Sequence, residues 1–158
     1  MFFSAQNMTE LLVYTLSGLI GTVGYTLINR MRLRRIALAS LGGALSVAVW
    51  FVCLYFTDNV FLSNLAGAFV VTVYSEIMAR VCKAPATIFL VPGIIPLVPG
   101  GRLYYTMAAL VSSDMEGFRT NGFQTVEIAL GIAVGIVLVS TIFSYIRSLR
   151  LEKLRGGR

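Results

Sequence analysis

The sequence contains no histidine, only two cysteines and few charges, and each shortage removes a class of function. Of its 158 residues, 13% are charged and 57% are hydrophobic, whereas a soluble domain has about 25% charged residues. Without histidine, a catalytic triad or a Cys/His nucleophile pair has no base, and a zinc site lacks its commonest nitrogen ligand. Cys53 and Cys82 are predicted to lie on opposite sides of the membrane, so we do not expect a disulfide between them. We therefore expect no metal site, no cofactor and no enzyme activity.

The hydrophobic residues form long runs that match the thickness of a membrane. A transmembrane helix needs about 20 apolar residues, and the charges of this chain fall in short clusters between such runs. The predicted spans cover residues 8–28, 36–56, 62–78, 85–111 and 125–146, followed by a basic tail over 147–158. We therefore expect an all-α integral membrane protein with about five transmembrane helices in a single membrane domain.

The basic residues predict how the chain is oriented, because Lys and Arg in short loops stay on the cytoplasmic side. They occupy the first loop, the third loop and the tail: Arg30, Arg32, Arg34, Arg35, Arg80, Lys83, Arg147, Arg150, Lys153, Arg155 and Arg158. The opposite loops hold Asp58, Asp114 and Glu116, with Arg119 as the single basic residue. This pattern predicts a protein of the cytoplasmic membrane with its N-terminus outside and its C-terminus inside. Contact with anionic lipid headgroups explains the basic charge without a nucleic-acid partner.

Small residues recur at the four-residue spacing that lets membrane helices approach closely. The pairs are Ser17 and Gly21, Ser63 and Gly67, and Gly131 and Gly135. They predict a compact bundle, in which the contacts lie either within the chain or with another copy in a homo-oligomer.

Polar residues inside the spans are candidates for caps or for proton transfer. Asn121 followed by Gln124 resembles a capping pair that begins the fifth span, and it places Glu127 in the first turns, where the helix dipole favours an acid. Glu76 and Arg80 lie one helical turn apart. They either form a structural ion pair or leave Glu76, with Glu127, as a carrier of protons.

All four prolines lie in one stretch of the fourth span, together with three glycines. These residues are Pro85, Pro92, Pro96, Pro99, Gly93, Gly100 and Gly101, and the tetrad LVPG occurs twice, at 90–93 and 97–100. Proline removes a backbone donor and clashes with the preceding turn, and glycine permits non-helical angles. The pattern predicts a broken helix whose freed backbone groups face protein or a water-lined cavity.

The second half of the broken span carries the best candidate for binding a solute. It is expected to begin near Gly100 to Arg102, with its amide groups exposed inside the membrane. A helix N-terminus and the Arg102 guanidinium together favour a carboxylate, and Tyr104 and Tyr105 would add hydroxyls. The alternative is a kinked or re-entrant segment that only shapes the bundle, with Arg102 reaching the interface or pairing with an acid. Asn64 and Tyr74 of the third span are further candidates to line the same cavity.

The segment FLVPGIIPLVPGGRLYYTM resembles the signature of the threonine/serine exporter family. The likeness is to the small subunit that corresponds to the C-terminal membrane half. It implies export of threonine and serine, or of a small carboxylate such as succinate, driven by the proton gradient and shared with a larger membrane subunit that resembles the N-terminal half. It also assigns function to Pro92, Gly93, Pro96, Pro99, Gly100 and Tyr104. The alternative that stays open is a non-transporting assembly or regulatory subunit.

Overall fold

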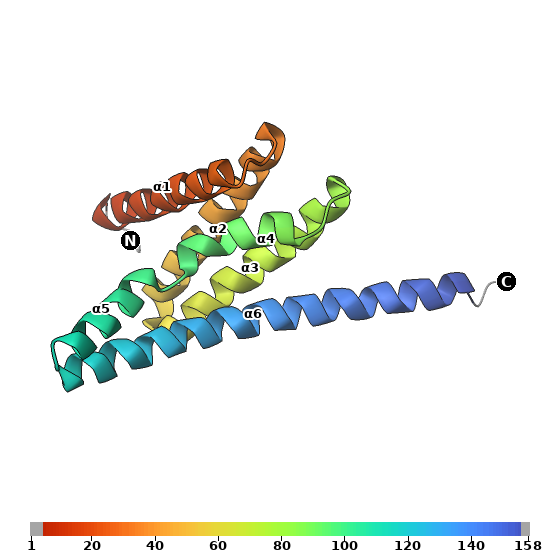
Figure 1. Cartoon of the computed structure of the whole chain (residues 1–158). Coiled ribbons are helices and arrows are strands. Elements are labelled where there is room, and N and C mark those ends of the chain that lie inside the picture. The colour runs from red at the N-terminus through yellow and green to blue at the C-terminus, as the bar shows by residue number, and fades with distance from the viewer. Residues whose placement is uncertain (1–4, 156–158) are drawn as a thin grey trace.

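The protein consists of helices joined by short turns (Figure 1). The computed structural model describes residues 5–155, and the side chains of residues 8–149. Its elements are α1 (Ala5–Ile28), α2 (Leu33–Thr57), α3 (Val60–Val81), α4 (Thr87–Ile94), the 3-10 turn η1 (Ile95–Leu97), α5 (Gly100–Val111) and α6 (Met115–Arg155). The all-α prediction is confirmed over these residues.

Four helices are long and apolar enough to cross a membrane, and a bent pair makes a fifth crossing if it is counted as one span. The four are Met8–Ile28, Leu33–Thr57, Val60–Val81 and Met115–Leu149, and the pair Thr87–Leu97 and Gly100–Val111 is bent by 52°. The predicted break in the fourth span is therefore confirmed. Figure 1 shows α1 and α6 on opposite sides of the bundle, with α2, α3 and the broken span between them.

The interior holds many small and hydroxyl-bearing side chains beside apolar ones such as Phe89 and Val71, while many large apolar side chains face outward. Thr22 and Ser75 are fully buried, and their hydroxyls donate to carbonyls one turn earlier in the same helix, at 2.8 and 2.7 Å. Each long helix also exposes some of its leucines, isoleucines or valines. This arrangement suits lipid, where outward apolar residues cost nothing and inward hydroxyls must be satisfied by the protein.

The glycines of α6 allow its close approach to α3. A Cβ atom at Gly131 would lie 2.7 Å from the Phe61 carbonyl oxygen, and one at Gly135 would lie 2.8 Å from that of Leu65. These distances leave no room for a side chain. The predicted contact at Gly131 and Gly135 is therefore confirmed and lies within the chain.

The close helix contact of α1 is not made by the predicted pair of small residues. Gly21 faces open space and Ser17 is exposed, so this pair is not a site of close approach. Gly18 makes the contact instead, because a Cβ there would lie 2.7 Å from the Val47 Cγ2 atom of α2. Spacing alone did not reveal which face of α1 turns inward.

Only the second LVPG tetrad interrupts the helix. α4 continues through Pro92 to Ile94, whereas Val98 is extended (φ −62°, ψ 129°) and α5 begins directly after Pro99. A residue that precedes proline is pushed out of helical angles, which accounts for Val98. Pro92 lies inside α4. It has no N–H to donate, so the helix loses one backbone hydrogen bond at that turn.

The polar residues assigned to the start of the fifth span lie inside a longer helix. α6 begins at Met115, because the Asp114 carboxylate accepts the Gly117 N–H at 3.0 Å and ends the turn after α5. The predicted cap at Asn121 is wrong, since its side-chain amide donates to the Gly117 carbonyl at 2.9 Å in mid-helix. The helix also continues past residue 146 to Arg155.

Candidate functional site

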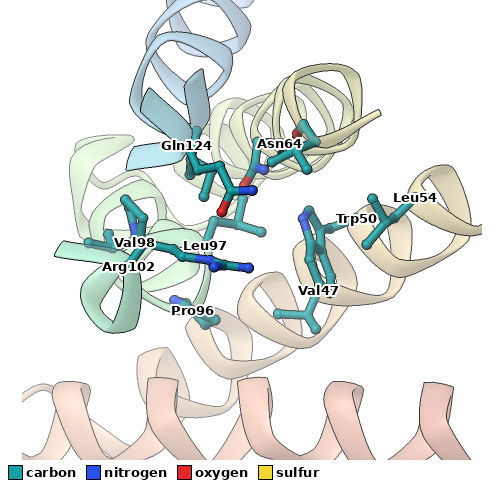
Figure 2. A pocket seen from close by; sticks show the side chains of 12 residues that line it. Val47, Trp50, Leu54, Asn64, Pro96, Leu97, Val98, Arg102 and Gln124 are labelled. Atoms are coloured by element: carbon teal, nitrogen blue, oxygen red, sulfur yellow. Dashed lines mark hydrogen bonds between the residues drawn. The ribbon is translucent and has the colours of Figure 1, made fainter. Parts of the chain in front are cut away.

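A cavity of about 420 Å³ lies where the fourth span breaks. Its walls come from α2, α3, the segment 96–99, the first turn of α5 and the first third of α6 (Figure 2). Apolar side chains such as Val47, Leu54 and Ile128 form most of the lining. A cavity with apolar walls and a few polar groups is the usual form of a site for a small solute.

The cavity lies toward one end of the bundle. Val60, the first residue of α3, and Arg102, in the first turn of α5, line it together. Arg102 therefore lies near the end of the bundle at which α3 begins. A charge near the end of a span costs less than a charge at its centre.

Arg102 supplies the positive charge of the cavity. Figure 2 shows its guanidinium extending between Gln124, Pro96 and Trp50. One of its nitrogens, Nη1, donates to the Asn121 side-chain oxygen at 3.3 Å, and among the described side chains no carboxylate forms an ion pair with it. Pro99 gives the N-terminus of α5 no side-chain cap. The guanidinium and the helix end therefore favour an anion at the same place.

Gln124 supplies an acceptor to the same cavity. Its side-chain carbonyl oxygen is buried and has no hydrogen-bond partner among the described residues. Leaving such an atom unpaired costs about 1–3 kcal/mol. Asn64 approaches from α3, with its amide nitrogen bound to the Val60 carbonyl at 2.8 Å. The cavity therefore offers a cation beside a free acceptor, which matches a solute with a carboxylate and a hydroxyl or ammonium group.

Three of the predicted site residues line this cavity, namely Pro96, Pro99 and Arg102. Gly93 lies elsewhere, because it is buried where α4 packs against α2 and α3, and a Cβ atom there would overlap the Val71 side chain. Pro92 faces a different hollow near the start of α4. The two LVPG repeats therefore lie in different surroundings, the second at the cavity and the first where α4 packs against α2 and α3.

The remaining residues of the motif lie outside the cavity lining. Cβ atoms at Gly100 and Gly101 would meet nothing within 4 Å. Tyr104 and Tyr105 are 68% and 58% exposed, and their rings pack edge to face with centroids 5.5 Å apart. In this chain by itself they present an aromatic surface and do not touch the Arg102 cavity.

Two residues of the cavity were not predicted from the sequence, and of two further candidates one lines the cavity and one does not. Trp50 and Gln124 line it, yet the first drew no attention and the second was assigned to a cap. Asn64 lines it as proposed, whereas the Tyr74 hydroxyl donates to the Leu38 carbonyl of α2 at 2.7 Å, away from the cavity. The sequence features that could have indicated these cavity residues are a single tryptophan and two amide side chains among apolar residues.

Glu76 and Arg80 lie near the opposite end of α3. Their closest oxygen and nitrogen atoms are 3.8 Å apart, and the Arg80 guanidinium lies 4.6 Å from the centroid of the Phe143 ring. They line a separate hollow of about 700 Å³. Glu127 is half-buried on α6 and lines neither hollow. The ion pair is formed, and a proton-carrying role for either acid stays a prediction.

Comparison with known proteins decides the family. The sequence profile described as Threonine/Serine exporter, ThrE, matches residues 14–142, which include every wall of the cavity. The chain belongs to the threonine/serine exporter family. No curated protein and no solved structure matches it. As a member of this exporter family with apolar membrane-length helices, it is a membrane protein with a role in transport.

Proposed function

We propose that this chain is one subunit of a secondary transporter that exports small solutes bearing a carboxylate. Threonine and serine are the first candidates, from the family name, and a dicarboxylate such as succinate is the second. The observation that carries the proposal is Arg102, a cation without a carboxylate partner among the described side chains, at the wall of a cavity beside a broken helix.

The geometry supports a simple binding scheme. The solute carboxylate replaces Asn121 as the partner of the Arg102 guanidinium, which can hold both carboxylate oxygens at once. The hydroxyl or ammonium group of the same solute donates to the buried Gln124 oxygen. Val98 and Pro99, which separate η1 from α5, form the hinge about which the half-helices move.

The proposal also covers the membrane in which the subunit lies, its orientation and its partners. We place it in the cytoplasmic membrane with the Arg102 cavity toward the outside, because Asp58 and Asp114 lie at the same end of the bundle as that cavity. A larger membrane subunit completes the translocation path, and copies of this chain associate with one another in the assembly. The subunit performs no chemistry on its solute.

The test is substitution of Arg102 in a flux assay. Export of labelled threonine, serine and succinate is measured in vesicles that contain this chain alone, and then this chain with its larger partner. Arg102→Gln should weaken solute binding by roughly 10- to 100-fold, because a hydrogen-bonded charge contributes about 1.5–3 kcal/mol. Arg102→Lys should recover part of the loss, since it restores the charge but not the two-pronged contact.

The matched control is Arg119→Gln, which removes an exposed arginine of α6 that does not line the cavity. It should leave flux unchanged. Normal flux with Arg102→Gln would sink the assignment of the site. Normal complex formation without flux in any combination of wild-type subunits would favour the assembly subunit instead.

A further inference from the structure

α1 packs chiefly against α2 and makes only slight contact with the broken span, which leaves a crevice lined by both. Two hollows lie in this crevice. The first, of about 480 Å³, lies between the α1–α2 turn and the beginning of α4. The second, of about 200 Å³, lies further along between the middle of α1 and η1. They share no lining residue and lie one after the other along the contact between α1 and the broken span.

The first hollow is strongly positive. Arg30, Arg32 and Arg35 line it, and none of its lining residues is acidic. Arg30 adopts left-handed backbone angles (φ 52°), which turn the chain sharply between α1 and α2. α2 begins at Leu33 with no side-chain cap on its first amides. Three arginines beside a helix N-terminus without a side-chain cap favour an anionic group such as a phosphate.

The rest of the crevice is apolar. Ile88, Val91 and Pro92 of α4 form the far wall of the first hollow. The second hollow lies one step further along, between Gly21 and Ile95, and a Cβ atom at Gly21 would meet nothing within 4 Å. A free anion needs no such extension. An amphiphile with a charged head and an aliphatic chain uses both parts.

We propose that this crevice binds one anionic phospholipid. Its phosphate lies among Arg30, Arg32 and Arg35, and one acyl chain runs between α1 and α4 toward η1. The lipid fills the gap beside the broken span and holds α4 against the α1–α2 turn. This is a defined site between helices, in contrast to the general attraction of a basic surface for a charged membrane.

The experiment is native mass spectrometry of the full-length chain, with phosphatidylglycerol or phosphatidylcholine added in detergent. We expect one phosphatidylglycerol to stay bound, and about tenfold tighter binding of it than of phosphatidylcholine, which corresponds to one decade in Kd. Arg32→Lys with Arg35→Lys keeps the charge that sets topology but loses the two-pronged contacts, so retention should fall severalfold. Val91→Trp should abolish retention of the lipid, because the larger side chain would fill the first hollow.

Two controls match these variants. Arg147→Lys changes an arginine that lines a different hollow, and Val137→Trp places the same bulk on an exposed face of α6. Both should retain the lipid. Equal binding of the two lipids, or retention by Val91→Trp, would overturn the proposal. Displacement of phosphatidylglycerol by millimolar inorganic phosphate or succinate would also overturn it, because the site would then be one for small anions. The Arg→Lys variant keeps the test decisive if Val91→Trp fails to fold.

Discussion

Gly93 and Gly100 occupy the same place in two copies of one tetrad, but their surroundings differ completely. Gly93 is buried against Val71 and the backbone of Gly42 and Gly43, whereas a Cβ atom at Gly100 would meet nothing within 4 Å. Glycine is therefore required at position 93 by packing. At position 100 the structure imposes no such requirement within this chain.

We predict opposite outcomes for alanine at the two positions. Gly93→Ala should destabilise the fold by about 1–3 kcal/mol, because overpacking a tight contact forces Val71 or α4 to shift. Gly100→Ala should leave stability unchanged or slightly higher, since alanine favours a helix over glycine. The unfolding midpoints of the two purified variants in one detergent provide the measurement. Equal midpoints would show that the close approach of α4 to α2 is not as tight as described.

At the scale of elements, a side-chain hydrogen bond joins α4 of the broken span to α2. The Ser46 hydroxyl of α2 is shared between two acceptors, the Gly93 carbonyl at 2.9 Å and the Gly43 carbonyl of its own helix at 2.8 Å. Pro96, three residues after Gly93, has no N–H to offer that carbonyl in a tightened turn. A side chain of α2 thus replaces a donor that the proline removed from the fourth span.

Ser46→Ala should therefore destabilise the protein by about 1–3 kcal/mol, the cost of a buried acceptor without its partner. Ser40→Ala is the matched control, because Ser40 is equally buried on α2 but its hydroxyl donates only to the Ile36 carbonyl of the same helix, at 2.8 Å. Thermal unfolding of the two variants should differ clearly. Identical midpoints would mean that another donor satisfies Gly93.

At the scale of the whole molecule, α5 and α6 form a hairpin that extends past the rest of the bundle (Figure 1). α6 has 41 residues and is roughly 60 Å long, twice the hydrocarbon thickness of a bilayer. Gly131 lies against Phe61 near the start of α3, so the preceding part of α6 projects beyond that end by roughly 24 Å. The tip of the hairpin therefore lies beyond the hydrocarbon if α1 to α3 span it.

This arrangement predicts which positions a membrane-impermeant maleimide can reach. In a background with Cys53→Ala and Cys82→Ala, Ser113→Cys at the hairpin tip should be labelled on intact cells. Ser148→Cys near the other end of α6 should be labelled only after the cells are permeabilised, since the basic residues predict that this end is inside. The reverse pattern would invert the orientation and would place the Arg102 cavity on the cytoplasmic side.

Prediction from sequence succeeded where one physical constraint dominates. The hydrocarbon thickness fixes the length of apolar runs, so the helices were located to within a few residues except at the two ends of α6. Asn121 and Gln124 looked like a cap because both are polar, but Asp114 already caps the helix from the preceding turn. Polarity without periodicity could not separate a helix end from the wall of a cavity.

The sequence by itself determined that this is a membrane protein of about five membrane-length apolar segments and where the fourth one breaks, because these follow from backbone hydrogen bonding in lipid and from the geometry of proline. Only the tertiary structure decided which parts of the motif share a cavity. Pro96, Pro99 and Arg102 meet Gln124 and Asn64 there, whereas Gly93 faces α2 and the tyrosines face outward. The 52° bend rotates the two half-helices relative to each other, and the direction of a side chain after such a bend depends on packing that no local pattern encodes.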